Sequence, residues 1–516
     1  MNYSYSERTH SLVNIAQYFP GNRVYSDISE NVLLLKENEI DNYQLIVMEK
    51  LDNDTTYFDF KTQLGKKDIR PQVKFVSREE LAEISSAFDA TTSLSSDSQS
   101  DAQNKIIEII KRAVEMRASD IHFRIDTSYF QVAFRIDGIK RNITQFGDSA
   151  DKGRLLVNAL YNSMCTEQST STLSSTEASD ARLKEEFVTE FGLSTGRFAS
   201  RPGNSGTLLA VVRLITKRKQ QLELEQLGLT LRQASAIRRT LSKPSGAIFS
   251  SGPTGHGKST LSQCMAESVT RDDPGINLVT VEDPIESPIK GAVQTPLILA
   301  DRSDRELMGK AWGKAISNLM RLDPDFIYIG EVRDSTSATG VIEAAQTGHN
   351  VITTIHTSHP IDIIQRLRRF GVDQDLLTDA TLITCLIGLR LTPLLCPDCK
   401  LPYNQHKERV EAELHELIVK HTDSSNAFLI NESGCQKCEY TGIKGRTGVF
   451  EVIETDYQFM SLYESQGKFA AWKYWRNNGG ETLCENLTSL INKGKVDPVM
   501  AHKKICNLDR DEKFNE

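Results

Sequence analysis

The sequence lacks an apolar run long enough to span a membrane. A membrane-spanning helix takes about 20 apolar residues, and the nearest candidate, "ATLITCLIGL" (380–389), has ten and lies between Asp379 and Arg390. We predict that this run forms a buried helix. The first residues also lack the basic start and apolar core of a secretory signal. We therefore expect a cytoplasmic protein, in which any role at a membrane comes through a partner.

An excess of positive charge is also absent. The 516 residues include 61 Lys and Arg against 69 Asp and Glu, a formal net charge of −8. A mildly acidic chain has no general attraction to nucleic acid or to anionic lipid. The basic clusters "KRK" (217–219) and "RLRR" (366–369) are local, and each is most simply interpreted as a solvated face. Nucleic acid is therefore not an expected partner.

The nine cysteines do not indicate a disulfide framework, because their number is odd and the chain is expected to be cytoplasmic. Four of them form two CxxC pairs, Cys396 with Cys399 and Cys435 with Cys438. Two such pairs supply four soft thiolates, which complete a tetrahedral zinc site and leave no open position. The pattern predicts a structural Zn²⁺ site, with four unligated thiols as the alternative.

Changes in composition divide the chain. Residues 90–103, "ATTSLSSDSQSDAQ", are almost all small or polar and favour a flexible linker. The N-terminal module includes a strand-like run, "TYFDFK" (56–61), but offers no chemistry that we can interpret. After the linker, a helical pattern from Asn104 is followed by the alternating hairpin "SDIHFRID…FQVAFRIDG". We therefore predict four parts: an N-terminal module (1–88), a linker (89–103), a small α/β domain (104–218) and a larger domain (219–516).

The stretch "FSSGPTGHGKST" (249–260) has the P-loop pattern of a glycine, four residues and Gly-Lys-Ser. It lies between a short apolar strand and a helical pattern, which is the context that the mechanism requires. Glycines let backbone N–H groups turn toward phosphate oxygens, and the helix N-terminus adds the positive end of its dipole. We expect Lys258 to reach the β- and γ-phosphates and Ser259 to bind Mg²⁺. The predicted phosphate-binding residues are Gly252, Pro253, Thr254, Gly255, His256, Gly257, Lys258, Ser259 and Thr260.

Acidic and histidine side chains follow the other predicted strands. Glu331 ends the strand in "FIYIGEVRD", Glu282 ends the strand in "LVTVEDPIE", and His356 ends "VITTIH", with His349 seven residues before it. Polar groups at the carboxyl ends of parallel strands meet at one edge of a sheet, where ligands bind. A lone histidine is usually structural, but these residues beside a P-loop indicate a nucleotide site.

Together these motifs resemble those of the secretion ATPases that drive type II secretion and type IV pilus systems. "SGPTGHGKST" resembles the family's Walker A, "TVEDPIE" its aspartate box, "MRLDPDFIYIGEVRD" its Walker B and "AAQTGHNVITTIHTSHP" its histidine box. The resemblance covers roughly residues 104–516. It implies an α/β fold in which a small PAS-like domain precedes a RecA-like motor, and a ring that is usually a homo-hexamer.

The resemblance also implies roles for particular residues. Glu282 would polarise the attacking water, and Glu331 would hold Mg²⁺ beside the bound ATP. His349 and His356 of the histidine box would join the catalytic set. Arginines from the preceding domain of a neighbouring subunit would reach the phosphates, and the residues that match this description are Arg135, Arg197 and Arg213.

The cysteine pairs resemble a tetracysteine insertion of family members that assemble pili or power secretion. This implies a zinc-binding lobe (396–440) on the motor and a helical C-terminal tail. We favour an ATPase that assembles a type IV-like pilus and docks through residues 1–88 on a protein of the inner membrane; a type II secretion ATPase is the alternative. A nucleic-acid translocase is less favoured, because the chain is acidic and lacks a basic, aromatic-rich stripe. A catalytically dead scaffold conflicts with the complete acidic and P-loop set.

Overall fold

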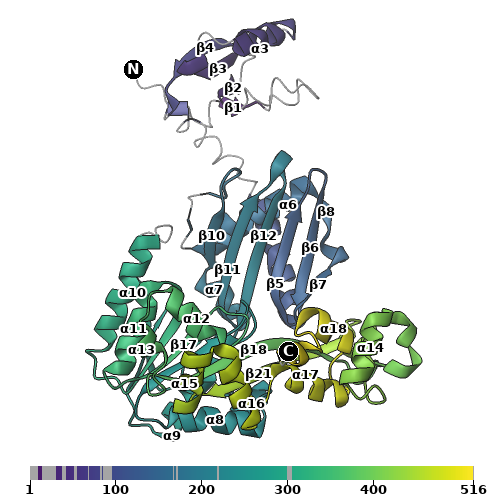
Figure 1. Cartoon of the computed structure of the whole chain (residues 1–516). Coiled ribbons are helices and arrows are strands. Elements are labelled where there is room, and N and C mark those ends of the chain that lie inside the picture. The colour runs from purple at the N-terminus through teal and green to yellow at the C-terminus, as the bar shows by residue number, and fades with distance from the viewer. Residues whose placement is uncertain are drawn as a thin grey trace. The chain divides into compact units, whose positions relative to one another are not determined.

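The structure is a computed structural model of the chain (Figure 1). It describes residues 10–13, 31–37, 42–51, 55–67, 69–78, 80–81, 84, 96–166, 168–169, 172–217, 220–298 and 305–514. The chain divides into two compact units, Met1–Glu108 and Ile109–Glu516.

The first unit contains a four-stranded sheet. Its strands, in spatial order, are β1 (His10–Leu12), β2 (Val32–Glu37), β3 (Tyr43–Met48) and β4 (Gln72–Val76). Helix α3 (Thr55–Lys66) connects β3 to its parallel neighbour β4 and packs Tyr57, Phe60 and Leu64 against Leu34 and Leu45 of the sheet. The run "TYFDFK", predicted as a strand, is therefore helical, because its buried residues recur at the helical spacing.

Helix α5 (Ser96–Glu115) begins earlier than the sequence predicted. Residues 89–95 of the predicted linker lie outside the described residues, but the rest of it is helical instead of flexible. Ala102 and Ile106 are already buried. The apolar stripe that continues through Ile110 therefore extends the helix toward its N-terminus despite the polar composition.

The second unit contains two large sheets. The first has eight strands in the order β7-β6-β5-β12-β11-β10-β9, and β8 pairs with β6. Its elements are β5 (Ala118–Ile125), β6 (Tyr129–Ile136), β7 (Ile139–Asn142), β8 (Asp148–Ser149), α6 (Ala150–Met164), β9 (Cys165–Thr166), β10 (Ser179–Leu183), α7 (Glu185–Glu190), β11 (Leu193–Pro202) and β12 (Leu208–Thr216). The predicted hairpin is β5 and β6, which pair antiparallel.

The second sheet has seven strands in the order β15-β14-β16-β17-β13-β18-β21. They are β13 (Gly246–Ser251), β14 (Leu278–Glu282), β15 (Ala292–Pro296), β16 (Phe326–Val332), β17 (Asn350–Ile355), β18 (Ile383–Leu395) and β21 (Ile443–Glu454). All neighbours are parallel except β18 and β21. The carboxyl ends of β13, β14, β16 and β17 thus meet at one edge, as the sequence predicted.

Helices cover both faces of this sheet (Figure 1). They are α8 (Leu231–Leu241), α9 (Lys258–Asp272), α10 (Arg305–Leu319), α11 (Ser335–Gln346), α12 (Asp362–Arg369) and α13 (Gln374–Leu377). Because strand side chains alternate between faces, Phe249 and Ile327 belong to the core under α10 and α11, whereas Ile248 and Tyr328 belong to the core under α8 and α9. Apolar cores on both faces hold the parallel strands in register, so that their carboxyl ends stay at one edge of the sheet.

The run "ATLITCLIGL", predicted as a buried helix, contributes the first half of β18. Residues 383–389 are all buried, with Leu386 facing one core and Ile387 the other. A strand covered on both faces is a continuous apolar run, and its pattern resembles that of a short buried helix. Within the part of the chain that the structure describes, no helix combines the length and apolarity needed to cross a membrane.

The C-terminal region is helical, as predicted. Its elements are β19 (Leu401–Pro402), α14 (Ala412–His421), β20 (Phe428–Leu429), α15 (Tyr457–Gln466), α16 (Lys468–Asn477), α17 (Leu483–Asn492), α18 (Pro498–Lys504) and α19 (Arg510–Lys513). Leu414 and Ile418 of α14 share a buried core with Leu487 and Ile491 of α17 and with Val449 of β21. This core joins the tail to the lobe that carries the cysteine pairs.

Candidate active site

The P-loop connects β13 to α9. Gly255 (φ 77°) and Gly257 (φ 91°) adopt the left-handed conformation that favours glycine. Gly252 lies against the Leu389 carbonyl, which a Cβ at position 252 would approach to 2.5 Å. The loop therefore needs its glycines, both for its turns and for its contact with β18. The first helical residue is Lys258, so the helix N-terminus opens directly onto the loop.

The Lys258 ammonium is buried inside the loop. Its Nζ donates to the carbonyl oxygens of Gly252 (2.9 Å) and Pro253 (3.2 Å). Burial lowers the pKa of Lys258, and the nearby Glu331 carboxylate opposes that shift. The ammonium thus has only weak backbone acceptors, which a phosphate oxygen can replace with a charge-assisted hydrogen bond.

His256 holds the loop against the sheet. Its Nδ1 accepts a hydrogen bond from the Leu391 backbone N–H at 3.0 Å. Burial lowers the pKa of His256 to about 4, and Arg390 and Arg446 add to that effect. The ring is therefore neutral near pH 7, with its acceptor nitrogen used by β18, which favours a positioning role for this predicted phosphate-binding residue.

Glu282 lies at the end of β14 and is almost fully buried. Its Oε1 accepts hydrogen bonds from Thr280 Oγ1 and Gln294 Nε2, both at 2.8 Å. Burial raises the pKa of Glu282, while these two hydrogen bonds act in the opposite direction. A carboxylate with a raised pKa, held in place by two donors, is suited to accept a proton from water near neutral pH.

Glu331 belongs to a row of charged side chains near the ends of β14, β16 and β17. Its Oε1 lies 3.1 Å from His356 Nε2, and its Oε2 accepts from Arg333 Nε at 3.0 Å. Arg333 also lies 3.8 Å from Asp283. The exposed Ser259 hydroxyl at the start of α9 and the Glu331 carboxylate line one cleft. They are oxygen ligands of the kind that Mg²⁺ prefers.

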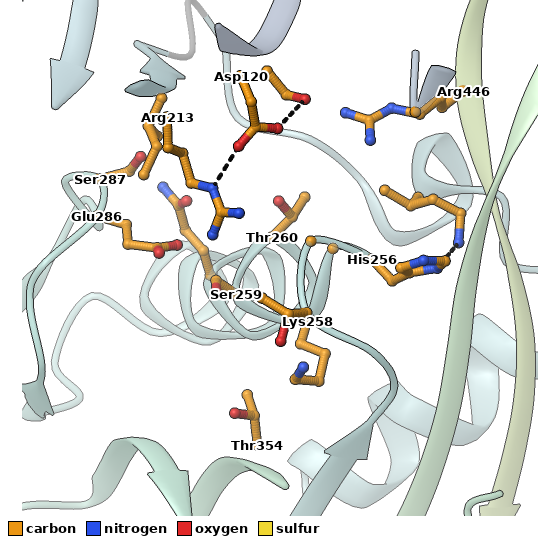
Figure 2. Close-up of a pocket in the computed structure, with 18 of the residues that line it drawn as sticks. Asp120, Arg213, His256, Lys258, Ser259, Thr260, Glu286, Ser287, Thr354 and Arg446 are labelled. Carbon is orange, nitrogen blue, oxygen red and sulfur yellow. Dashed lines mark hydrogen bonds and ion pairs between the residues drawn. The ribbon is translucent and has the colours of Figure 1, made fainter. Parts of the chain in front are cut away.

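The three predicted arginines come from the first sheet of the same unit. Asp120 of β5, which is 5% exposed, pairs with Arg213 of β12 (3.0 Å) and Arg135 of β6 (3.8 Å). Arg197 of β11 lies 3.5 Å from Glu286. Figure 2 shows the Arg213 side chain extending from Asp120 toward the start of α9, where Lys258, Ser259 and Thr260 lie.

These groups line one cleft of about 950 Å³. From the sequence predictions it includes Thr254, Gly255, His256, Gly257, Lys258, Ser259, Thr260, Glu282, Glu331, His356, Arg135, Arg197 and Arg213. Gly252 and Pro253 contribute the carbonyls that hold Lys258. We expected the arginines to face the P-loop of a neighbouring subunit, but this chain holds them in the same cleft as its own P-loop; an arginine supplied by a neighbour stays a prediction.

His349 is the predicted catalytic residue that the structure does not bring to the cleft. It precedes β17, at the opposite end of that strand from His356, and its Nδ1 lies 3.0 Å from the Ala344 carbonyl and from Thr347 Oγ1. The histidine box therefore supplies one histidine to the cleft. The order of strand and histidine in the sequence could have indicated this, since only residues after a strand lie at its carboxyl end.

Several cleft residues were missed from the sequence. Asp120, Gln294 and Trp312 line or support the cleft, from elements whose packing no local pattern specifies. Arg446 of β21 is a fourth example, and Figure 2 shows it on the His256 side of the loop. Asp120 does lie in the quoted "SDIHF", so the sequence did contain one signal of its role, an acidic residue within a predicted strand.

The four predicted zinc ligands come together in the lobe. All four sulfur atoms lie within 4.8 Å of one another. Cys396 and Cys435 are 3.9 Å apart, Cys399 and Cys438 are 3.8 Å apart, and Cys435 and Cys438 are 3.8 Å apart. Zn–S bonds of about 2.3 Å in a tetrahedron place the sulfurs about 3.8 Å apart. The four side chains therefore fit a tetrahedral zinc ion in size and in ligand chemistry.

Comparisons with known proteins agree with this geometry. Residues 95–505 match the family model described as Type II/IV secretion system protein. The chain is 30% identical over 400 residues to Type II secretion system protein E of Aeromonas hydrophila, covering 76% of this chain and 72% of that protein. It is 31% identical over 391 residues to the Protein transport protein HofB homolog of Escherichia coli (strain K12), covering 75% and 77%.

Among solved structures, the pilus retraction motor PilT with bound ADP matches 78% of this chain and 99% of its own, with a TM-score of 0.51 and 22% identity, a likeness of fold. The family match spans the helix α5, both large sheets and the cysteine lobe. The chain therefore belongs to the family of type II/IV secretion system proteins and is a P-loop ATPase of that family.

Proposed function

We propose that the chain hydrolyses ATP to drive protein transport by a type II secretion system. The observation that carries this proposal is the convergence of the P-loop, two strand-end glutamates and three arginines in one cleft. The transport system is inferred from the relatives, several of which are named type II secretion system proteins. Pilus assembly, which we favoured from the sequence, becomes the second candidate; the tetracysteine lobe is compatible with either.

In this proposal the glutamates divide two tasks. Glu282, with its raised pKa, takes a proton from the attacking water. Glu331 and Ser259 hold Mg²⁺, which neutralises charge on the phosphates when it is bound. Lys258 exchanges its backbone carbonyl partners for phosphate oxygens. His356, 3.1 Å from Glu331, keeps that carboxylate oriented toward the cleft.

The arginines stabilise charge on the transferred phosphoryl group. Arg213 and Arg135 share Asp120 as a partner, so one buried carboxylate holds two cations in the cleft that the P-loop also lines. Their side chains are 47% and 40% exposed, which leaves them accessible to a nucleotide. We further propose that six chains form a ring in which each cleft works in turn.

The lobe holds zinc in a structural role. Four thiolates leave no position for a substrate, and the cysteines are supported by the protein backbone, as in the bond from Gly442 N–H to Cys438 Sγ (3.2 Å). We also propose that residues 1–88 dock on an inner-membrane protein of the secretion system, because none of the described residues in this part of the chain lines the cleft.

A strain that carries Glu282→Gln in place of the native residue tests the function. A type II secretion ATPase predicts that proteins normally exported to the medium accumulate inside the cell while surface pili remain. Loss of pili with export intact would support the second candidate instead. If the purified native chain does not release phosphate from ATP, or if the variant strain keeps both export and pili, the proposal is wrong.

A further inference from the structure

The cysteine lobe contacts the hairpin that carries Arg135, and these contacts are the basis of the inference. The hairpin consists of β6 and β7, joined by a two-residue turn at Asp137 (φ 47°) and Gly138 (φ 88°). Such a turn, with both φ angles positive, is the tight connection typical of hairpins. Arg135 Nη1 donates to the Gly138 carbonyl at 3.1 Å, so the position of Arg135 is tied to the turn.

The opposite surface is the segment that includes and follows the second cysteine pair, residues 435–445, which we call the knuckle segment. Three contacts join it to the hairpin. The guanidinium of Arg141 donates to the Thr441 carbonyl and to the Tyr440 carbonyl (3.4 Å). The Asp137 carboxylate accepts from the Gly445 backbone N–H at 2.9 Å.

The cysteines fix the shape of the knuckle segment. Glu439 (φ 51°) and Tyr440 (φ 57°) are consecutive non-glycine residues in the left-handed region, which costs about 1–2 kcal/mol for each residue. The surroundings of Cys438 hold them there: Thr441 Oγ1 donates to the Cys438 carbonyl at 2.5 Å and Gly442 N–H donates to Cys438 Sγ. The Gly442 carbonyl in turn accepts from Cys396 N–H at 3.0 Å. The two carbonyls that Arg141 contacts therefore depend on both cysteine pairs.

The contacts also lie at the nucleotide cleft. Asp137 and Gly138 line it, and so does Arg446, the residue that follows Gly445. Asp137 is 8% exposed, and a second arginine, Arg117, lies 3.4 Å from its carboxylate. A shift of the knuckle segment would therefore move the turn that positions Arg135.

We propose that Arg141 and Asp137 are positioning residues that couple metal loading of the cysteine lobe to the placement of Arg135 in the cleft. The inference rests on the proposed ATPase function and deepens it. With the four thiolates ligated, the knuckle segment presents two carbonyls and one N–H in fixed places. Arg141 matches the two carbonyls with its planar fork of donors, which a lysine cannot reproduce.

The test compares Arg141→Ala, Arg141→Lys and Asp137→Asn with the native full-length chain. Arg124→Ala is the matched control: Arg124 lies on the adjacent strand β5, pairs with Asp126 and does not line the cleft. Each protein is assayed for zinc content, for KM and kcat with ATP, and for hydrogen exchange of residues 129–142. The same assays are run on Cys438→Ser and on Cys438→Ser combined with Arg141→Ala.

We expect Arg141→Ala and Asp137→Asn to keep their zinc, to exchange faster in the hairpin and to raise KM for ATP about tenfold, the scale of a lost hydrogen bond to a charged group. Arg141→Lys should have nearly the same exchange rate in the hairpin and the same KM as Arg141→Ala, because a lysine cannot bind both carbonyls. Cys438→Ser should have the same effect on the hairpin and on KM, and the double variant should be no worse, because both changes break one coupling.

The proposal is overturned if the Arg141 and Asp137 variants behave like Arg124→Ala, or if Cys438→Ser loses zinc without altering exchange in the hairpin. Loss of zinc from both Arg141→Ala and Asp137→Asn would also overturn it, since the contacts would then serve the lobe itself. The exchange and zinc measurements need no hydrolysis. A native chain without ATPase activity would therefore refute the proposed function and still leave the coupling to be judged.

Discussion

A buried ion pair fastens the C-terminal tail to the motor, and its removal gives a quantitative prediction. Glu451 of β21 has no exposed side-chain surface, and Arg510 of α19 has 9%. Their closest atoms are 2.8 Å apart, a second hydrogen bond measures 3.2 Å, and Glu451 also accepts from the Leu483 backbone N–H at 3.1 Å. The pair thus joins the final helix, the start of α17 and the edge strand.

Removing one partner should lower the free energy of unfolding far more than replacing both. Arg510→Met leaves the Glu451 carboxylate buried without its cation, and such a change costs about 3–5 kcal/mol of unfolding free energy. Replacing the pair by apolar residues of similar volume is often neutral. The double variant Glu451→Leu with Arg510→Met should therefore recover most of the stability that Arg510→Met loses. It should not recover all of it, because Glu451→Leu also removes the acceptor of the Leu483 backbone N–H.

Tryptophan fluorescence during guanidinium unfolding follows this region, because two of the three tryptophans, Trp472 and Trp475, lie on α16. The native chain, Arg510→Met, Glu451→Leu and the double variant are compared at the same nucleotide concentration. A loss below about 1 kcal/mol for Arg510→Met, or a double variant as unstable as the sum of its single changes, would refute the reasoning that a desolvated charge sets the cost.

Four further predictions concern the cleft, the lobe and the first unit. Lys258→Ala should abolish ATP hydrolysis, because it removes the cation that binds the phosphates. The circular dichroism spectrum should stay native, because the Lys258 side chain lies in the P-loop and is part of neither apolar core of the sheet. Near-normal turnover would rule out the P-loop assignment. Glu282→Gln should bind ATP and hydrolyse it at least ~10²-fold more slowly. Because the pKa of Glu282 is raised and activity is lost as the pH falls through it, the rate should begin to fall at a pH above the usual glutamate pKa. Gln294→Leu removes a hydrogen bond that lowers this pKa, so the fall should move to still higher pH. A pH profile that this variant leaves unchanged would contradict the role of Glu282 as the base. Cys396→Ser should reduce zinc below one ion per chain and lower the thermal midpoint, whereas a native chain without zinc by elemental analysis would reject the site. A chain that lacks residues 1–95, and so keeps α5 whole, should retain most ATPase activity and lose membrane recruitment in cells; recruitment without this part would contradict the docking proposal.

The sequence predicted the parts of the site that are local. Lys258 and Ser259 are placed by a loop of fixed spacing, and Glu282 and Glu331 lie at the carboxyl ends of the buried strands β14 and β16. Residues that act through packing between distant segments were not predictable in this way. Asp120, for example, becomes a partner of Arg213 only because β5 and β12 are neighbours in the first sheet.

The errors have physical causes as well. Residues 383–389 were predicted as helix because complete burial removes the alternation that distinguishes a strand. Residues from Ser96 were predicted as linker because composition was given more weight than the apolar stripe that begins at Ala102. The strand was therefore determined by its surroundings, whereas the helix was indicated by apolar residues of the segment itself.

The pairing of β18 with β21 has a consequence for insertions and deletions. Val449, Glu451 and Ile453 face the C-terminal helices, whereas Phe450 and Val452 face the core under α8. One residue inserted after Gly445 would exchange these two faces, since side chains alternate along a strand, and would place the carboxylate of Glu451 in an apolar core. Residues 403–427, which include α14, are not a strand of this sheet, so a change in their length does not shift the register of β21. Natural variation in length within this lobe is therefore expected between the cysteine pairs, and a graft of the lobe onto another motor must preserve the strand residue for residue.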